Sequence, residues 1–319
     1  MNILITSAGR RVSLVKSFKE TIKSLKIESR VFITDLNPKT SPASYFADDS
    51  FEIGFFKDPD YIDDLLKICL NNNISIIIPT IDTELILLAN AKLFFKSNGI
   101  NIIISSNRII EILEDKIATN TFFNTLNIKT PLIYNQKNLK FPVFLKPLNG
   151  SNSKGIYKAE KISEIKPSDL VSKNMMILEY IDSAKYDEYT IDIYYDKNSI
   201  LKCAVPRIRL KVVGGESNQG ITKKNKVLDF VLKKFKFLEG AIGCLTLQVF
   251  SNKLNPIDII GIEINPRFGG GYPFSLNAGA NFPEFIIREY VLNQKIDYFD
   301  NWKDNCLNIR YENEIIVND

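Results

Sequence analysis

The chain has 319 residues, of which 45% are hydrophobic and 24% are charged, and this length allows two or three compact units, each with its own core. Its 41 lysines and arginines outnumber 37 acidic residues by only four and form no basic stripe, so we expect neither nucleic acid nor a membrane as a partner. The sequence contains no histidine, which excludes Ser-His-Asp and Cys-His catalysis and His-ligated metals. Any chemistry must therefore use carboxylates, lysine, arginine, amides and bound metal.

Apolar strands alternate with amphipathic helices in the first third of the chain. The pattern predicts strands at residues 2–6, 31–35, 74–78 and 100–104, with helices between them. Such continuous apolar strands are typical of a parallel, doubly wound α/β sheet. The four cysteines are far apart and form no C-x-x-C pair, which indicates reduced thiols and a cytoplasmic protein.

Two loops of this first unit invite a functional interpretation. The loop after the first strand holds a single glycine, Gly9, so it does not match the G-x-G-x-x-G turn of dinucleotide-binding domains. This counts against an NAD(P)-dependent dehydrogenase with Asp35 at the ribose, which we keep only as an alternative. Asp82 follows the strand at 74–78, where open α/β sheets bind ligands, but we prefer to interpret it as a helix cap.

A second unit begins near residue 112. Asp115 and Lys116 open a helix, and an apolar strand at 141–147 delivers Lys146 at its end. The small, polar segment 149–155 follows, and its backbone N–H groups are suited to phosphate oxygens. It lacks the G-K-[ST] ending of a Walker loop, so a plain hairpin loop is the alternative.

Polar side chains alternate along two later strands. Residues 245–250 and 257–265 predict a hairpin whose turn places Gln248 opposite Glu263, with Asn265 on the same face. Carboxylate and amide oxygens of this kind suit Mg²⁺, although ordinary hydrogen bonds between buried strands would also explain them. Arg267 and three glycines follow the hairpin directly. Arg207 and Arg209, two residues apart on another strand, are candidates for an anion clamp.

In this order, the motifs resemble the ATP-grasp superfamily. The likeness extends to single-chain relatives of the carbamoyl-phosphate synthase large subunit. It rests on Lys116, on Lys146 with its Gly/Ser loop, on segment 178–181, on Glu188-Tyr189-Thr190, and on Gln248 with segment 263–267. Residues 1–112 look like the pre-ATP-grasp domain of that group, so the resemblance covers nearly the whole chain.

The resemblance implies a fold and a set of site residues. It implies a Rossmann-like pre-ATP-grasp domain (1–112) and an ATP-grasp domain (113–319) with a small nucleotide-binding subdomain (113–181) and a large one (182–319), hence an α/β and α+β protein. By the same likeness, ATP would be bound by Lys116, Lys146, Gly150, Ser151, Ser153, Gly155, Glu179, Tyr180, Ile181, Glu188, Gln248 and Glu263. Mg²⁺, or Mn²⁺ in its place, would be held by Gln248, Glu263 and Asn265, and the catalytic residues would be Arg267, Lys146 and Arg209. Glu188 lies nine positions after Glu179, a longer connection than we expect in this family, so Asp187 is an alternative at the ribose.

The resemblance also implies an activity. We expect an ATP- and Mg²⁺-dependent ligase that joins a small-molecule carboxylate to an amine or ammonia through an acyl phosphate and releases ADP and phosphate. The alternatives are a carbamoyl-phosphate synthase-like enzyme acting on bicarbonate or carbamate, the dehydrogenase, and a non-catalytic nucleotide-binding subunit. The sequence names neither substrate and leaves open whether the protein is a homodimer.

Overall fold

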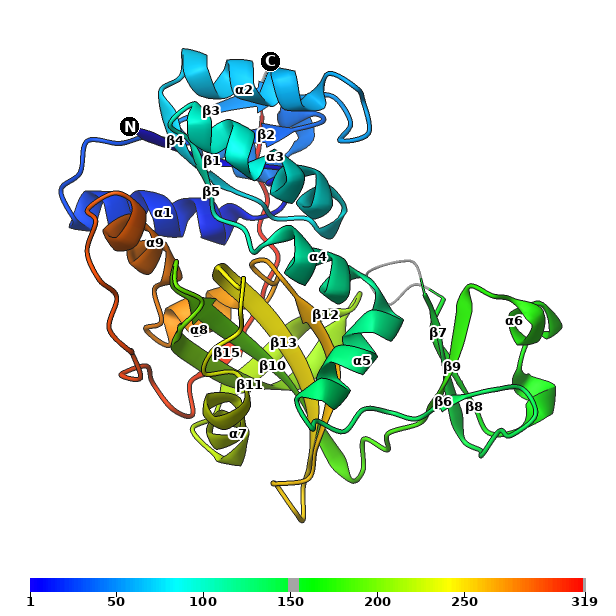
Figure 1. Ribbon diagram of the computed structural model, residues 1–319. Helices are drawn as coiled ribbons and strands as arrows, with labels where there is room; N and C mark the ends of the chain where they lie inside the picture. Colours follow the sequence, from blue (N-terminus) through cyan, green and yellow to red (C-terminus); the bar gives the residue numbers. More distant parts are fainter. Residues whose placement is uncertain (149–154, 318–319) are drawn as a thin grey trace.

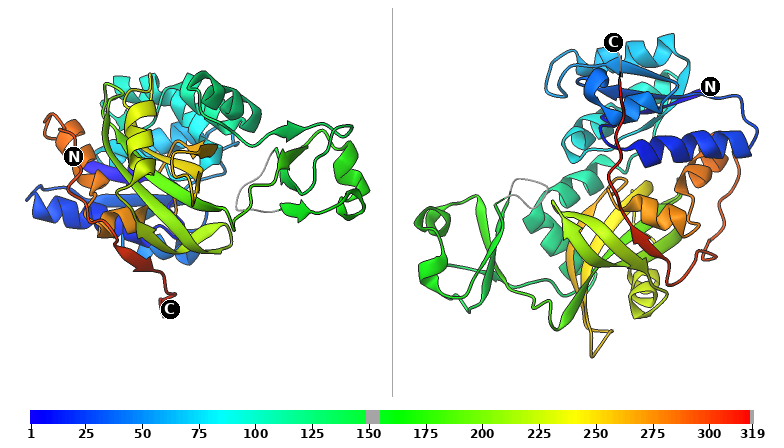
Figure 2. Two further views of the ribbon diagram at one scale, coloured as in Figure 1. Left: turned by 90° about the horizontal axis from the view of Figure 1, so that it is seen from below. Right: turned by 180° about the vertical axis from the view of Figure 1, so that it is seen from behind.

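Three sheets with their covering helices make up the computed structural model of this chain, which describes residues 1–148 and 155–317 (Figure 1). An N-terminal domain lies above a large central sheet, and a small subdomain projects to one side of that sheet. Figure 2 shows from two further directions that the small subdomain extends away from the rest, while the N-terminal domain packs over the large sheet. This arrangement confirms the expected α/β and α+β class.

The N-terminal domain is a parallel sheet in the order β3-β2-β1-β4-β5. Helix α1 covers one face, and α2 and α3 cover the other, so the apolar strands are buried on both sides. The edge strand β3 was not expected, because its four residues (Asp-Ser-Phe-Glu) form no apolar run. The strands are β1 (Asn2–Ile5), β2 (Val31–Asp35), β3 (Asp49–Glu52), β4 (Ile74–Ile78) and β5 (Asn101–Ile102), and the helices are α1 (Val12–Ser24), α2 (Tyr61–Asn71) and α3 (Leu85–Ser97).

Two helices connect this domain to the rest of the chain. They are α4 (Asn107–Glu114) and α5 (Lys116–Thr125), and they pack against each other. The carboxylate of Asp115 accepts hydrogen bonds from the backbone N–H groups of Ile117 and Ala118, as expected for the cap of α5. The cap fixes where α5 begins, and therefore where Lys116 lies.

The small subdomain is an antiparallel sheet in the order β6-β9-β7-β8 with one short helix. Its own small core lies on one face and includes Val143, Leu145 and Ile177. Because side chains alternate along a strand, Lys146 of β7 lies on the opposite face. The elements are β6 (Ile133–Tyr134), β7 (Val143–Pro147), β8 (Tyr157–Ala159), α6 (Pro167–Val171) and β9 (Met175–Glu179).

The large sheet is antiparallel, in the order β14-β13-β10-β11-β12-β15. Helix α7 lies on one face, where the Tyr195 hydroxyl donates to the Phe235 carbonyl, and α8 and α9 lie on the other. The strands are β10 (Tyr186–Tyr195), β11 (Leu201–Val213), β12 (Glu216–Thr222), β13 (Gly243–Asn252), β14 (Ile259–Asn265) and β15 (Leu307–Ile309), and the helices are α7 (Lys226–Lys234), α8 (Tyr272–Asn277) and α9 (Phe282–Tyr290). Beyond β15 the chain returns toward the N-terminal domain (Figure 2). Across the described residues, no helix has the length and apolar character needed to cross a bilayer.

Candidate active site

One face of the large sheet carries a polar row, which consists of Glu188, Arg209, Gln248 and Glu263 from four different strands. The register pairs Gln248 with Glu263, as the hairpin interpretation expected. The Arg209 guanidinium donates to the carboxylate of Glu188 and, at 3.3 Å, to the amide oxygen of Gln248. Its other terminal nitrogen donates to the Gly215 carbonyl at 2.6 Å. Arg209 therefore contacts both middle members of the row, Glu188 and Gln248, and fixes their side chains relative to each other.

A lysine from the small subdomain reaches the end of this row. The Nζ of Lys146 lies 2.6 Å from Oε2 of Glu263, and the Asn265 amide donates to Oε1 of the same carboxylate at 3.3 Å. Burial by itself would raise the pKa of Glu263, but Lys146, the Asn265 amide and Lys116 together lower it below its ordinary value. Glu263 is therefore an ionised carboxylate that already faces a cation.

The donor set around Glu263 fits a magnesium ion. Asn265 uses its nitrogen toward Glu263, which leaves its oxygen as a ligand, and Gln248 offers a second amide oxygen on the same face. Among the described residues, no group of three or more Asp, Glu, Cys or His side chains is placed to hold a metal. Mg²⁺ is bound through one or two carboxylates together with phosphate oxygens and water, so this sparse set suits a metal that arrives with a nucleotide.

Lys116 lies beside Lys146. Its Nζ donates to the carbonyl oxygens of Pro147 and Leu148, at 2.7 Å and 2.5 Å. Burial and the charge of Lys146 lower the pKa of Lys116, and Glu263 opposes that shift. Helix α5 and strand β7 therefore bring both expected phosphate-binding lysines to the same end of the large sheet.

The Gly/Ser loop is only partly described. Gly150, Ser151 and Ser153 lie outside the described residues. Gly155 has a φ of +74°, and a Cβ there would lie 3.2 Å from the Pro147 ring, so glycine is favoured at this position. The loop thus returns close to the end of β7.

The segment between the two subdomains contains the expected adenine-binding residues. Glu179 is tied to Leu132, because its backbone N–H donates to that carbonyl at 2.8 Å and its carboxylate accepts from the Leu132 N–H at 3.2 Å. The Tyr180 ring lies under the ammonium group of Lys158. Ile181 follows in the connection to β10. The side chain of Glu179 is engaged within the subdomain, which leaves backbone atoms of this segment for a base.

Glu188 and Asp187 lie on opposite faces of β10. Glu188 belongs to the polar row, whereas Asp187 pairs with Lys253 at 3.6 Å. Of the two candidates for the ribose, only Glu188 therefore shares a face with Gln248 and Glu263.

Arg267 is bound by a residue of the N-terminal domain. Its Nε and Nη2 lie 2.7 Å and 2.5 Å from the two carboxylate oxygens of Asp82. Asp82 begins a single 3-10 turn and caps no helix, so the interpretation as a helix cap is wrong. Sequence reasoning missed this role because the two residues are 185 positions apart and nothing local to Asp82 indicates its partner.

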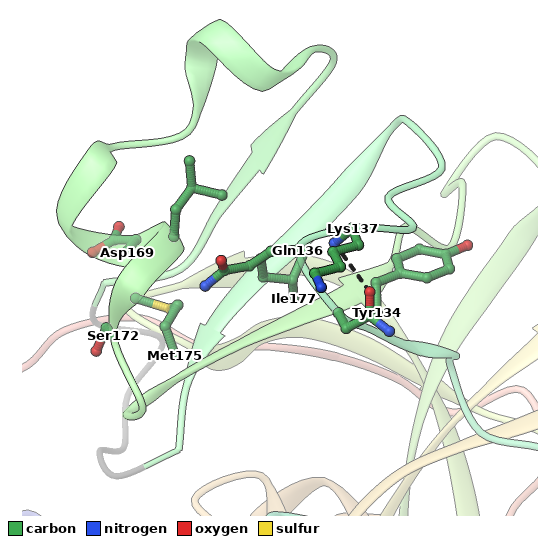
Figure 3. A pocket seen from close by; sticks show the side chains of 9 residues that line it. Tyr134, Gln136, Lys137, Asp169, Ser172, Met175 and Ile177 are labelled. Atoms are coloured by element: carbon green, nitrogen blue, oxygen red, sulfur yellow. Dashed lines mark hydrogen bonds between the residues drawn. The ribbon is translucent and has the colours of Figure 1, made fainter.

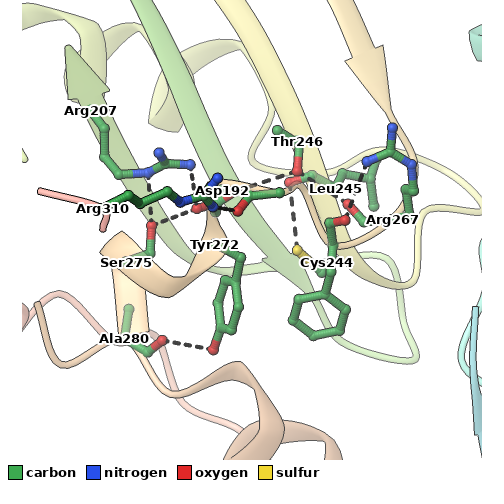
Figure 4. A network of polar contacts seen from close by, with 12 residues as sticks. Asp192, Arg207, Cys244, Leu245, Thr246, Arg267, Tyr272, Ser275, Ala280 and Arg310 are labelled. Carbon is green, nitrogen blue, oxygen red and sulfur yellow. Dashed lines mark hydrogen bonds and ion pairs between the residues drawn. The ribbon is translucent and has the colours of Figure 1, made fainter. Parts of the chain in front are cut away.

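A buried network lies next to Arg267 (Figure 4). Arg207 and Asp192 form an ion pair at 2.7 Å with side chains that are 1% and 0% exposed, and Ser275 of α8 hydrogen-bonds to both. Arg207 and Arg209 share a face as expected, but each already has a carboxylate partner. The structure therefore does not support the anion clamp that the sequence suggested.

A hollow of about 500 Å³ lies elsewhere, in the small subdomain (Figure 3). It is lined by Met175 and Ile177 of β9 and by Tyr134 of β6, with residues near α6. Met175 and Ile177 lie on the face of β9 opposite to Met176, which is the register partner of Lys146. The hollow therefore opens away from the polar row and is not part of this site.

Two family models match the sequence. One, described as the PylC-like N-terminal domain, matches residues 3–103, and the other, described as ATP-grasp in the biosynthetic pathway with Ter operon, matches residues 171–313. Residues 171–313 are thus similar to the ATP-grasp family. The ATP-grasp match covers segment 178–181 and Arg267. It also covers β10 to β14, which include the four strands that carry the polar row. This match supports the enzyme class that we expected, an ATP-dependent ligase that forms C–N bonds.

Solved structures share the overall fold of this chain. The biotin carboxylase domain of Hydrogenobacter thermophilus 2-oxoglutarate carboxylase, solved as a dimer with MgADP, ADP and bicarbonate, has a TM-score of 0.70 at 14% identity, over 95% of this chain and 72% of that one. Campylobacter jejuni biotin carboxylase, solved as a β-γ-ATP complex, gives 0.66 at 16% identity over 91% and 70%. Thermotoga maritima N5-carboxyaminoimidazole ribonucleotide synthetase gives 0.63 at 19% identity over 92% and 76%. A search of curated proteins found no match.

These comparisons support the ATP-grasp superfamily but do not confirm the carbamoyl-phosphate synthase-like subtype. The dehydrogenase alternative gains no support from the N-terminal domain. The Asp35 carboxylate there accepts hydrogen bonds from the backbone N–H groups of Gly9 and Asn37, so it is occupied by its own loop.

Proposed function

We propose that this protein is an ATP- and Mg²⁺-dependent ligase that activates a small-molecule carboxylate as an acyl phosphate and transfers the acyl group to an amine or ammonia. The ion pair between Lys146 and Glu263 carries the proposal, because it brings a lysine of the small subdomain to the carboxylate of the polar row. The pair brings the proposed phosphate-binding lysine and the proposed metal-binding carboxylate to the same point. That point is where the γ-phosphate of ATP would lie.

In the first step, an oxygen of the acceptor carboxylate attacks the γ-phosphorus of ATP. A new P–O bond forms, the bond from that phosphorus to the β,γ-bridging oxygen breaks, and ADP leaves with the electron pair. Lys116 and Lys146 would neutralise the phosphate oxygens, and Arg267 would lie against the transferred phosphoryl group. Arg209 would act by orienting Glu188 and Gln248, which it contacts.

In the second step, the amine nitrogen attacks the acyl carbon. The C–N bond forms, the C–O bond to phosphate breaks, phosphate leaves, and the nitrogen loses a proton to solvent. An acyl phosphate hydrolyses if water reaches it, so the site must exclude water while this intermediate is present. The amide or related C–N product, ADP and phosphate balance the reaction.

The residues present fit a magnesium ion held by Gln248, Glu263 and Asn265, with Mn²⁺ as a substitute. When bound with the nucleotide, the ion would draw charge from the β- and γ-phosphates. The adenine would contact the backbone of residues 179–181, and Glu188 would accept hydrogen bonds from the ribose hydroxyls. The MgADP in the Hydrogenobacter biotin carboxylase domain supports this choice of nucleotide and metal. That domain was solved as a dimer, and we propose a homodimer here by the same likeness.

Carboxylate-stimulated ADP release tests the proposal. The purified chain would be incubated with ATP, Mg²⁺ and a panel of carboxylates, each with ammonia or an amino acid, and Lys146→Met and Glu263→Gln should lower the stimulated rate by about 100-fold or more. The matched controls are Lys226→Met and Asp229→Asn, which remove an exposed ion pair of 3.0 Å on α7 and should leave the rate unchanged. Equal rates for Lys146→Met and the wild type would reject the assignment.

A further inference from the structure

Four guanidinium groups from distant parts of the chain gather next to the proposed reaction centre. We call this set the arginine cluster; it consists of Arg11, Arg207, Arg267 and Arg310. Arg11 precedes α1, Arg207 lies on β11, Arg267 follows β14, and Arg310 follows β15. Among the described residues, the carboxylates paired with this set are Asp82, Asp192 and Glu216, so it carries one positive charge more than these partners neutralise.

Three members of the cluster are already paired. Arg267 binds Asp82, Arg207 binds Asp192, and Arg310 binds Glu216 at 2.7 Å and also the carbonyl oxygen of Gly270. Arg207 and Arg310 both lie over the ring of Phe274, and Figure 4 shows them together beside Asp192. Arg207 nevertheless keeps one buried nitrogen, Nη1, without a hydrogen-bond partner in the described part of the chain.

Arg11 differs from the other three. The only hydrogen bond that its side chain makes within the described residues is to the Thr80 carbonyl oxygen at 3.1 Å. Asp82 and Glu216 are near enough to act on its charge, but both are paired with other arginines, and no described Asp or Glu forms an ion pair with Arg11. The side chain is half-buried, and burial together with the charge of Arg267 lowers the pKa of Arg11 to about 10. A half-buried guanidinium without a carboxylate is costly unless an anion joins it.

The space around this group is kept open by glycine. A Cβ at Gly271 would lie 2.6 Å from Nη1 of Arg207, and a Cβ at Gly270 would lie 2.7 Å from the Glu216 carboxylate. The two glycines directly follow Arg267, Phe268 and Gly269. The backbone that leaves the metal-binding hairpin therefore passes within contact distance of the cluster.

We propose that the acceptor carries a second anionic group, a carboxylate or a phosphate, which pairs with Arg11 while its reacting carboxylate lies at Arg267. This proposal rests on the ligase function proposed above and names the class of its acceptor. Arg11 belongs to the N-terminal domain, so that domain selects the acceptor while the ATP-grasp domain performs the chemistry. The exposed neighbour Arg10 adds further positive charge near Glu216.

Binding measurements test the proposal without requiring turnover. The melting temperature of the full chain with MgADP would be recorded against dicarboxylates from malonate to adipate and against the half-amide of each, since a half-amide keeps the shape and loses one charge. A dicarboxylate should stabilise the protein at a concentration at least about tenfold lower than its half-amide, because only the bound state is stabilised. Glycerate and 3-phosphoglycerate form a second pair, which distinguishes a phosphate from a carboxylate as the second group.

Arg11→Gln should remove this preference, and Arg11→Lys should restore part of it, because lysine keeps the charge but not the planar fork. Arg108→Gln is the matched control; it removes the same charge from an exposed position of α4 and should keep the preference. The proposal is overturned if no dianion binds wild type more tightly than its single-charge counterpart, or if Arg11→Gln weakens both equally.

Turnover separates this proposal from the ligase function. Carboxylate-stimulated ADP release that is equal for dicarboxylates and half-amides would keep the ligase function and reject the role of Arg11. A preference for dianions in binding, without any stimulated ADP release, would keep the role of Arg11 in anion binding and reject the ligase function.

Discussion

Replacing Asp192 with asparagine should strongly destabilise the protein. The Asp192 carboxylate lies 2.7 Å from Arg207 and 2.6 Å from the Ser275 hydroxyl, and neither charged side chain is more than 1% exposed. Asparagine keeps the shape but removes the negative charge, so Arg207 stays buried without compensation. Breaking a buried ion pair in this way costs about 3–5 kcal/mol. In a unit of this size that loss lowers the melting temperature by roughly 6–20 °C.

Urea denaturation and thermal melting measure the effect. Asp229→Asn is the control, because it removes a carboxylate from an exposed pair and should change the free energy of unfolding by about 0.5 kcal/mol or less. The double variant Asp192→Asn/Arg207→Met removes both charges and should recover at least half of the loss. If Asp192→Asn unfolds within about 1 kcal/mol of wild type, or if the double variant is no more stable than the single one, the reasoning from an uncompensated buried charge is refuted.

Three further predictions follow from the site and the backbone. Glu188→Ala should raise the KM for ATP about tenfold, or about 1.4 kcal/mol, whereas Asp187→Ala should leave it nearly unchanged, and equal effects in steady-state kinetics would contradict the choice between them. The pKa of Glu263 is held below its ordinary value of 4.5, so its ionised form and the stability it provides persist above that pH and are lost only as the pH falls through the lower folded value. Calorimetric titration should therefore show that the affinity for MgADP does not fall between pH 7 and about pH 5 through protonation of Glu263. A fall in affinity centred near pH 6 that is present in the wild type and absent in Glu263→Gln would contradict the lowered pKa. Gly99→Ala should cost about 1 kcal/mol for its positive φ alone, while Gly240→Ala should cost about 1–3 kcal/mol more, because its added Cβ would lie 2.2 Å from a serine oxygen; similar losses in urea denaturation would argue against the clash.

Local patterns were sufficient for much of the fold. Continuous apolar runs predicted the parallel N-terminal strands, and the strand at 31–35 was confirmed as β2 (Val31–Asp35). Alternating side chains and a turn-rich connection predicted the pairing of Gln248 with Glu263, because the register of a hairpin depends only on residues close in the sequence. Elements without an apolar pattern could not be predicted in this way. An example is β3 (Asp49–Glu52), which forms at the edge of the sheet because it pairs with β2.

The sequence by itself thus determined most of the strands and the pairing of Gln248 with Glu263 in the hairpin, since each depends on spacing within a short segment. Tertiary structure alone decided which charges neutralise one another. It paired Asp82 with Arg267 and Asp192 with Arg207, and it left Arg11 without an ion pair in the part of the chain that the structure describes. Such pairings join residues from separate elements, and the physical reason they escape sequence analysis is that the attraction between two charges depends on their distance and burial, which only the packed chain defines.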